Sequence, residues 1–428
     1  MIKITIHRGT DEIGGSCVEL TTDATRILID IGERLEPVNV KKAFRKQGPP
    51  KFLPKSLTES LEKEPPIAAI LISHAHRDHF GLLPLLPASI PVYMSEGSKI
   101  MLNLSEYFRP ESKISQKVNT FPLNIAFDTI KHEFTLGDFT ITPFLADHSA
   151  MDACSFLIEA GGKQIFYSGD IRAHGRKKVM FDRLVSKPPN DIDALVLEGT
   201  TLGRVGSGAS GETELEDALV KVFRAADDLC LASFSSQNID RLVTVYRACI
   251  KSGKTLVIDP YTAYILEKVH HLHKSIPNWD SDNMAVFYTK NSHTKLLEKE
   301  KLLHNFDASE WKIDDLRKNR KRIVMKMNFK NRFILEKLNM LHGSTLIWSQ
   351  WGDYIRQEEL FWKKNGIQPK FLHVSGHAYK KDLQRLVNSM KPCCIIPIHT
   401  QYKKDYPAVF APTPVKILED GKVVKIKL

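Results

Sequence analysis

The sequence predicts an α/β protein whose two parts differ in strand pattern. Its 428 residues exceed one ordinary domain, so two or three structural modules are expected. Residues 1–200 contain many short apolar runs separated by turn-forming residues, a pattern typical of a strand-rich region. Beyond the Gly- and Ser-rich segment Leu202–Gly211, helices and strands alternate, which is typical of a parallel α/β module. We therefore predict a domain boundary at that segment.

The first region is expected to contain at least six strands. Several of them are continuously apolar, which indicates that both faces of the strand are covered. These strands are predicted at Ile2–Ile6, Arg26–Ile31, Ile67–Ile72, Phe139–Phe144, Gln164–Tyr167 and Ala194–Leu197. One helix is expected over Gly97–Tyr107, and another directly after His79, carrying Leu82, Leu83, Leu85 and Leu86.

In the second region each predicted helix precedes a predicted strand. The helices are expected near Thr213–Ala226, Asn238–Lys251, Gln357–Lys364 and Lys381–Met390. The strands are expected at Leu229–Ser233, Thr255–Asp259, Thr345–Trp348, Phe371–Val374 and Ile395–Ile398.

The amino-acid composition is that of a folded globular protein. Apolar residues make up 42% and charged residues 26% of the chain, which excludes a disordered or fibrous protein. The net charge of +11 suits an anionic partner such as nucleic acid. The six cysteines are scattered without a Cys-x-x-Cys pair, so we expect neither a disulfide framework nor a thiolate zinc site, and we expect a cytoplasmic location. The chain opens as a strand and contains no apolar run of 18 residues, so no secretion or membrane span is expected.

A histidine-rich segment is the strongest chemical signal in the sequence. His74-Ala75-His76-Arg77-Asp78-His79 follows the apolar run 67–72. In an extended segment residues i and i+2 point the same way, so His74 and His76 can bind one metal ion together. Asp78 and His79 follow as the chain turns and can face a second metal ion. The alternative is a surface or capping cluster of histidines, but so dense a spacing is improbable by chance.

Two further residues at predicted strand ends can complete the metal site. His148 follows the strand that ends near Phe144, and Asp170 follows the strand that ends at Tyr167. Taken singly, His148 would be an ordinary loop histidine and Asp170 a helix cap. In this order after the first cluster, both are interpreted as ligands, with Asp170 bridging two cations. Imidazole and carboxylate ligands suit zinc, and manganese is also possible.

These motifs resemble the ordered signature of the metallo-β-lactamase fold. Asp30 is similar to the first motif, which supports the metal loop without binding metal. Three later motifs resemble those of the β-CASP nucleases: Glu198 in Leu197-Glu198-Gly199, His377 in Ser375-Gly376-His377, and His399 in Ile398-His399. The amino-acid sequence around His377 is similar to that of bacterial RNase J. The resemblance extends over essentially the whole chain.

The resemblance implies a metallo-β-lactamase αββα sandwich with an inserted β-CASP α/β domain. We therefore expect the first domain over 1–208, the inserted domain over 209–366 and the return of the first domain over 367–428. The extra C-terminal domain of typical RNase J has no counterpart before Leu428. The assembly of the protein is thus left open, with a homodimer possible.

The function implied is a metal-dependent ribonuclease, acting as a 5′-to-3′ exonuclease, an endonuclease or both. Two Zn²⁺ ions per chain, or Mn²⁺, would activate the water that attacks the scissile phosphorus. Asp78 would orient this nucleophile, His377 would hold the phosphate and protonate the leaving oxygen, and Glu198 would orient His377. His373 is interpreted either as a second phosphate contact or as a core histidine. The expected ligands are His74, His76, Asp78, His79, His148, Asp170 and His399.

Substrate contacts are expected in two segments. Ser233, Ser235, Ser236 and Asn238 resemble the RNase J segment that receives an RNA 5′ phosphate, and Ser375, Gly376 and His377 belong to the motif above. The expected partner is single-stranded RNA with a 5′ monophosphate. The alternative interpretation of 233–238 is a capped helix N-terminus, which is itself an anion site.

Three other functions remain as alternatives. A DNA nuclease of the same family is the first, although a histidine at position 399 favours RNA. A small-molecule hydrolase such as a thioesterase or lactonase is the second, and Glu198, His377 and the insert argue against it. A non-catalytic partner subunit is the third, although no ligand is missing. The basic stretch Arg317–Arg332 is interpreted as a solvated helix face or as a track for the substrate backbone.

Overall fold

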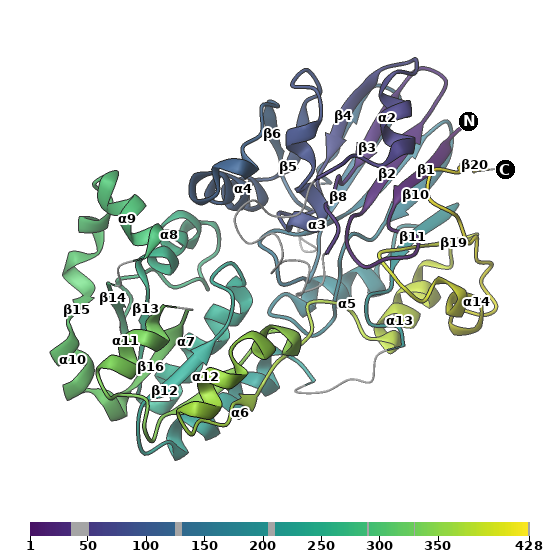
Figure 1. Ribbon diagram of the computed structural model, residues 1–428. Coiled ribbons are helices and arrows are strands. Elements are labelled where there is room, and N and C mark those ends of the chain that lie inside the picture. Colours follow the sequence, from purple (N-terminus) through teal and green to yellow (C-terminus); the bar gives the residue numbers. More distant parts are fainter. Residues whose placement is uncertain (36–50, 125–130, 204–209, 289–290, 329, 427–428) are drawn as a thin grey trace. The chain divides into compact units, whose positions relative to one another are not determined.

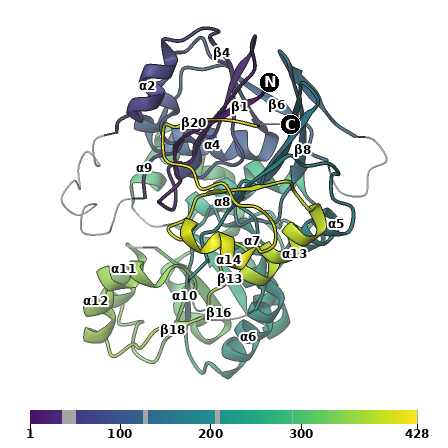
Figure 2. The same ribbon diagram turned by 90° about the vertical axis from the view of Figure 1, so that its right-hand side faces the viewer.

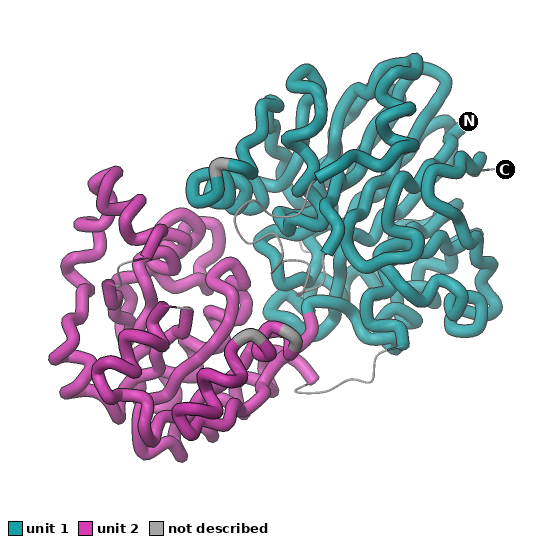
Figure 3. The backbone as a smooth tube through the Cα atoms, in the orientation of Figure 1, with its two compact units in different colours: residues 1–206, 376–428 teal, residues 207–375 magenta. Residues whose placement is uncertain are grey.

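The computed structural model describes residues 1–35, 51–124, 131–203, 210–288, 291–328 and 330–426 (Figure 1). The chain divides into two compact units (Figure 3). Unit 1 comprises residues 1–206 and 376–428, and unit 2 comprises residues 207–375. Unit 2 is therefore inserted into the sequence of unit 1.

The return to unit 1 occurs nine residues later than the sequence suggested. We expected it at 367, whereas unit 2 extends to residue 375. The reason is a short strand, β18 (Lys370–Phe371), which pairs in parallel with β17 (Thr345–Trp348) and so belongs to the sheet of unit 2. The expected departure near 208 lies outside the described residues.

Unit 1 is built on two sheets. The first has seven strands in the order β20-β1-β2-β3-β4-β5-β6, antiparallel from β20 to β3 and parallel from β3 to β6. These strands are β1 (Lys3–Arg8), β2 (Cys17–Thr21), β3 (Arg26–Ile29), β4 (Ile67–Leu71), β5 (Val92–Ser95), β6 (Val118–Phe121) and β20 (Val423–Lys425).

The second sheet has six strands in the order β19-β11-β10-β9-β8-β7. Strands β10, β11 and β19 run parallel, so the carboxyl ends of β10, β11 and β19 meet at one edge. The strands are β7 (Phe134–Leu136), β8 (Phe139–Leu145), β9 (Cys154–Ala160), β10 (Lys163–Tyr167), β11 (Ala194–Glu198) and β19 (Ile395–Ile398).

The two sheets of unit 1 pack face to face with helices outside them (Figure 2). One apolar cluster joins the inner faces, for example Ile4, Val18 and Ile29 with Ile158 and Val196. A second cluster lies between the outer face of the second sheet and helices α5, α13 and α14. This two-sheet sandwich confirms the predicted fold class. The helices are α2 (Lys55–Leu61), α3 (Arg77–Phe80), α4 (Glu96–Phe108), α5 (Lys178–Ser186), α13 (Lys380–Met390) and α14 (Tyr406–Val409), with 3₁₀ turns at Leu83–Leu85, Pro110–Ser112 and Lys403–Asp405.

Unit 2 is an open parallel α/β sheet of seven strands in the order β15-β14-β13-β16-β12-β17-β18. Its other strands are β12 (Cys230–Ser233), β13 (Thr255–Ile258), β14 (Met284–Phe287), β15 (Glu310–Trp311) and β16 (Ile323–Met327). Its helices are α6 (Glu212–Ala225), α7 (Ile239–Ser252), α8 (Pro260–Val269), α9 (Ser292–Lys299), α10 (Ile313–Lys318), α11 (Asn331–Lys337) and α12 (Glu359–Lys364), with 3₁₀ turns at His270–Leu272, Leu303–Ser309, Arg320–Arg322 and Gly352–Gln357.

The six strands predicted for the first region are all present, with ends that differ by at most two residues. Two expectations about helices are wrong. The chain after His79 forms only the single turn α3 and a 3₁₀ turn over Leu83–Leu85, because Pro84 and Pro87 cannot continue a helix. The basic stretch 317–332 is not one helix face either, since it spans α10, a 3₁₀ turn, β16 and α11.

The strand expected at Phe371–Val374 is also shorter than predicted, since only Lys370 and Phe371 pair with β17. In the described part of the chain, none of the helices combines the length and the apolar character that crossing a bilayer requires.

Candidate metal centre

The histidine-rich segment lies at the carboxyl end of β4, in the first sheet of unit 1. Ser73 and His74 follow the strand, His76 is the residue that precedes α3, and Asp78 and His79 lie within its single turn. The short helix turns the chain back after His76, which brings two further side chains of the same segment to the site. As predicted, His74 and His76 converge, with His74 Nε2 and His76 Nδ1 3.1 Å apart.

The structure assembles a first ligand group from three imidazoles. His148 joins His74 and His76 from the loop that follows β8, and its Nε2 lies 3.4 Å from His76 Nδ1. The ligand atoms of all three residues lie within 4.8 Å of one another. A tetrahedral zinc ion with bonds of about 2.0–2.1 Å would separate its ligand atoms by roughly 3.3 Å. The spacing of this group therefore fits a single metal ion.

A second group contains a carboxylate and two imidazoles. Asp78, His79 and His399 also bring ligand atoms within 4.8 Å of one another. His399 directly follows β19 and adopts a positive φ of 52°, and its Nε2 lies 3.3 Å from Asp78 Oδ2. This group combines residues that are 321 positions apart in the sequence.

Asp170 lies between the two groups, directly after β10. Its Oδ2 is 3.7 Å from His74 Nε2 in the first group and 3.2 Å from His79 Nε2 in the second. Its Oδ1 is 3.8 Å from His399 Nδ1. One carboxylate thus faces both groups, with Oδ2 near a histidine of each group and Oδ1 near His399, which is the arrangement expected of a bridging ligand.

The chemistry of these residues fits divalent metal ions. Among the described residues, Asp170 Oδ1 is fully buried and has no hydrogen-bond partner. An unsatisfied carboxylate oxygen in the interior is costly unless a cation or donor compensates it. Imidazole nitrogens and carboxylate oxygens are ligands that zinc accepts, with manganese also compatible.

The pKa values of three of the histidines agree with a ligand role, whereas the pKa of His79 favours its protonated form, which must lose a proton before it can bind metal. Burial lowers the pKa of His74 and His148 well below the usual range, and it lowers the pKa of His76. These three side chains are therefore neutral and can donate a lone pair to a metal ion. Although burial opposes it, Asp170 and Asp30 raise the pKa of His79 well above its usual value.

Asp30 supports the metal loop but belongs to neither ligand group. Its Oδ2 accepts hydrogen bonds from His79 Nδ1 at 2.8 Å, Ser73 Oγ at 2.8 Å and Tyr167 OH at 2.7 Å. Its Oδ1 accepts the backbone N–H of Ser73 at 2.8 Å. Asp30 itself has a positive φ of 58° and is completely buried. This carboxylate orients one ligand imidazole and fixes the backbone where the histidine segment begins.

Several contacts that hold the ligands were not predicted from the sequence, including one made by Gly376, which was expected only as a substrate contact. Gly376 O accepts a hydrogen bond from His148 Nδ1 at 2.6 Å, and Thr200 Oγ1 lies 2.8 Å from His399 Nδ1. Such contacts to the second ring nitrogen select the tautomer that can bind metal. Ser73 and Tyr167 act in the same way through Asp30. Their only sequence signal is that each adjoins a motif or ends a strand.

His377 and Glu198 form a pair beside the ligand groups. Glu198 ends β11 and is fully buried, and its Oε1 lies 3.3 Å from His377 Nδ1. The backbone N–H of Thr200 donates to Glu198 Oε2 at 2.9 Å. The side chain of His377 is 21% exposed and its Nδ1 is 3.8 Å from Asp170 Oδ2. Burial opposes it, but Glu198 and Asp170 raise the pKa of His377, which favours its protonated form.

The predicted phosphate segment lies in unit 2, at the carboxyl end of β12. Ser233, Ser235 and Ser236 line a polar cavity of about 400 Å³. Asn238 caps the N-terminus of α7, since its Oδ1 accepts a hydrogen bond from the backbone N–H of Arg241 at 3.0 Å. This is the capped helix N-terminus that we gave as the alternative interpretation of residues 233–238. Ser236 Oγ bonds Thr262 Oγ1 at 2.9 Å.

The polar cavity also contains a buried lysine. From the sequence, this residue was noted only as part of the basic stretch 317–332. Lys326 lines the cavity with a residue exposure of 3%, and burial lowers its pKa, although Asp259 acts in the opposite direction. His373 lies 3.3 Å from Arg241 Nη1 within unit 2, and Ser375 is the last residue of that unit. A buried cation among hydroxyl groups can receive an anion.

Comparison with known proteins agrees with this geometry. Residues 25–225 match the family described as a beta-lactamase superfamily domain, and residues 369–406 match the Zn-dependent metallo-hydrolase RNA specificity domain. A solved structure, a protein of unknown function from Enterococcus faecalis, covers 99% of both chains with a TM-score of 0.77 at 21% identity. That likeness supports the fold alone.

Three relatives similar in sequence carry names that state a function. Ribonuclease J 2 of Streptococcus pyogenes is 24% identical over 80% of this chain and 61% of the relative. Ribonuclease J of Helicobacter pylori is 22% identical over 99% of this chain and 61% of the relative. Transcription termination factor FttA of Methanothermobacter thermautotrophicus is 24% identical over 66% of this chain and 45% of the relative. The chain thus spans about three fifths or less of the length of these relatives.

Gly32→Ala should disturb the metal loop. A Cβ at Gly32 would lie 1.7 Å from the carbonyl oxygen of Asp78, so the backbone around this ligand must move. We expect overpacking to cost about 1–3 kcal/mol and to lower metal occupancy. Thermal melting and elemental analysis of the purified variant measure the two effects. Gly352→Ala is the matched control, since nothing lies within 4 Å of its added Cβ. Full metal content in Gly32→Ala would contradict the expectation.

Proposed function

Because the chain belongs to the RNase J-like branch of the metallo-β-lactamase superfamily, we propose that it is a metal-dependent ribonuclease. The observation that carries the proposal is a set of five histidines and two aspartates, all buried except the half-buried His76, beside His377. Such a set holds metal, and the adjoining acid–base pair has access to a phosphate ester. The match to an RNA specificity domain and the names of the relatives support RNA as the substrate.

The proposed centre holds two Zn²⁺ ions per chain, with Mn²⁺ as the alternative. His74, His76 and His148 would hold one ion, and Asp78, His79 and His399 would hold the other, with Asp170 shared between them. When bound, such ions lower the pKa of a coordinated water to about 7 and offset charge on phosphate oxygens.

The residues around the ions have separable roles in this proposal. Burial raises the pKa of Asp78, but the hydrogen bond to His399 and the charge of His79 outweigh it and lower this pKa to about 2. Asp78 therefore stays ionised and orients the attacking water. His377, whose side chain is 21% exposed, holds a proton and transfers it to the leaving oxygen. Glu198 keeps His377 protonated and oriented.

We further propose that unit 2 receives a 5′ monophosphate. Three serines, Ser233, Ser235 and Ser236, and one lysine, Lys326, offer three hydroxyls and an ammonium group to one cavity. Hydrogen bonds to a charged group contribute about 1.5–3 kcal/mol each. A strand held by its 5′ end would be degraded from that end, which favours 5′-to-3′ exonuclease activity, while an endonuclease mode needs no end contact.

Matched single-stranded RNA and DNA of one sequence test the substrate class. We expect zinc- or manganese-dependent cleavage of the RNA and much slower cleavage of the DNA. Preference for the DNA would favour the DNA nuclease, and cleavage of neither, with hydrolysis of thioesters or lactones, would favour the small-molecule hydrolase. An inactive protein that retains its metal would favour a partner subunit.

The metal content of the purified protein should be about two ions per chain. Asp78→Ala is expected to lower the rate by several orders of magnitude while the thermal melting curve of the fold persists, because the site lies on strand ends and not in the apolar core. Elemental analysis and circular dichroism measure these quantities. Activity that survives removal of all transition metal by a chelator would refute the metal mechanism.

His377→Ala should lower the cleavage rate by about 10²–10⁴-fold, the range for a general acid, without loss of metal. Glu198→Gln should cause a smaller loss. A substrate with sulfur in place of the leaving oxygen needs no protonation, so the deficit of His377→Ala should largely vanish with it. A persistent deficit, or loss of metal in this variant, would assign His377 to another role.

Removal of the Ser235 and Ser236 hydroxyls, by alanine substitution of both, should slow cleavage of 5′-monophosphate RNA by at least about tenfold. RNA with a 5′ hydroxyl should be cleaved nearly as before. Ser344→Ala, which removes a hydroxyl bonded to the backbone elsewhere in unit 2, is the control. If the wild-type protein cuts both RNAs and circular RNA at the same rate, the end pocket does not exist and the endonuclease mode remains.

A further inference from the structure

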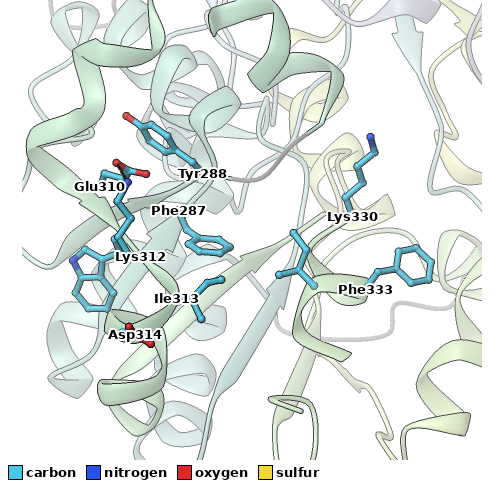
Figure 4. Close-up of a pocket in the computed structure, with 10 residues that line it drawn as sticks. Phe287, Tyr288, Glu310, Lys312, Ile313, Asp314, Lys330 and Phe333 are labelled. Atoms are coloured by element: carbon cyan, nitrogen blue, oxygen red, sulfur yellow. Dashed lines mark ion pairs between the residues drawn. The ribbon is translucent and has the colours of Figure 1, made fainter. Parts of the chain in front are cut away.

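Unit 2 contains a second, larger cavity outside the sites assigned above. It measures about 810 Å³ and lies at the carboxyl ends of β14 and β15, between α10 and α11. Figure 4 shows Phe287, Tyr288 and Ile313 on one side of it and Lys330 and Phe333 on the other. Trp311 also lines the cavity. Four aromatic residues therefore line this cavity.

The aromatic walls are held in place by the protein itself. The Tyr288 hydroxyl donates to Leu303 O at 2.8 Å and lies 3.0 Å from Asp307 Oδ1. The ring of Phe333 packs edge-on against Phe361, with centroids 5.4 Å apart, and the Arg332 guanidinium lies 4.8 Å from its centroid. A ligand would thus meet a preformed pocket and would lose little free energy in ordering these rings.

The charges at the cavity favour an anionic group near one position. Lys330 is exposed, and within the described residues no carboxylate pairs with it. The other charged groups that line the cavity are already in ion pairs: Glu310 with Lys312, and Asp314 with Arg317 at 3.4 Å. Lys330 is therefore the cation that remains available to a ligand.

Lys330 also lines the polar cavity that contains Ser235 and Lys326. The two cavities thus adjoin at this side chain, along the carboxyl ends of neighbouring strands in the parallel sheet of unit 2. In open α/β sheets, ligands bind at that edge. One cavity offers hydroxyls and ammonium groups, together with the carboxylates of Asp259 and Glu358, and the other offers aromatic side chains.

We infer that the aromatic cavity binds a nucleobase near the 5′ end of the RNA strand, stacked on its aromatic walls, with Lys330 contacting the adjoining phosphate. The inference rests on the proposed function and adds a base-binding site to it. The volume lies within the range of sites for small organic ligands, roughly 300–1,000 Å³. Stacking of bases on aromatic side chains tolerates any sequence, as a general ribonuclease requires.

Binding of short RNA to the Asp78→Ala protein, in which cleavage is blocked, tests the inference. The probes are 3′-labelled, 5′-monophosphate RNA 10-mers, one intact and three with an abasic residue at position 1, 2 or 3. We expect one abasic position to weaken binding about tenfold. Adding Trp311→Ala should weaken binding of the intact RNA about tenfold but leave that abasic RNA unchanged. Phe333→Ala, which truncates a half-exposed ring, should act in the same direction.

Matched control variants lie outside both cavities. Phe371→Ala removes an exposed aromatic ring at the opposite edge of the sheet, and Lys337→Ala removes an exposed lysine from the helix that follows Lys330. Neither should change binding more than about twofold, whereas Lys330→Ala should weaken it several-fold, and more so at low salt. If Trp311→Ala does not fold, as judged by circular dichroism, Phe333→Ala decides the test alone.

The outcomes separate this inference from the proposed function. If the wild-type protein cleaves RNA but Trp311→Ala and Phe333→Ala weaken the intact and all abasic RNAs equally or not at all, the base-binding site is refuted and the nuclease stands. If adenosine monophosphate binds with the same dependence on Trp311 while RNA does not, the cavity is a site for free nucleotides, which also overturns the inference. Absence of any metal-dependent RNA cleavage refutes the proposed function itself.

Discussion

The buried carboxylate of Asp30 is the interaction on which the metal centre depends. It accepts four hydrogen bonds, two of them from Ser73, at the point where β4 ends and the histidine segment begins. A carboxylate in the interior is costly unless its oxygens are satisfied, so the surrounding backbone has little freedom to rearrange. Because Tyr167 belongs to the second sheet, the same carboxylate also ties the two sheets of unit 1 together below the ligands.

The ligand side chains illustrate why such a centre needs a rigid sandwich. They come from the ends of β4, β8, β10 and β19, in two different sheets. Each strand delivers one or a few polar side chains at its tip, while its remaining residues pack into the apolar core. Concentrating imidazoles and aspartates in the interior is unfavourable without a cation, so the proposed metal ions would also stabilise this edge.

In the functions proposed here, unit 1 carries the catalytic residues and unit 2 carries the cavities that recognise the substrate. Unit 1 contains every ligand and the His377–Glu198 pair. Unit 2 contains the polar cavity and the aromatic cavity, both at the carboxyl edge of its parallel sheet. Lys326 and Lys330 belong to the same basic stretch of the sequence. In the structure Lys326 is buried and Lys330 is exposed, a difference that the run of basic residues does not reveal.

By itself, the sequence determined the fold class, the strands of the first region and the residues of the candidate metal centre. Those features depend on local patterns, such as apolar runs and the spacing of His74, His76 and His79. Tertiary structure decided that Gly376 holds His148, that Thr200 holds His399, and that the chain remains in unit 2 until 375. These contacts join residues far apart in the chain, and strand order and register, which no local pattern encodes, bring them together.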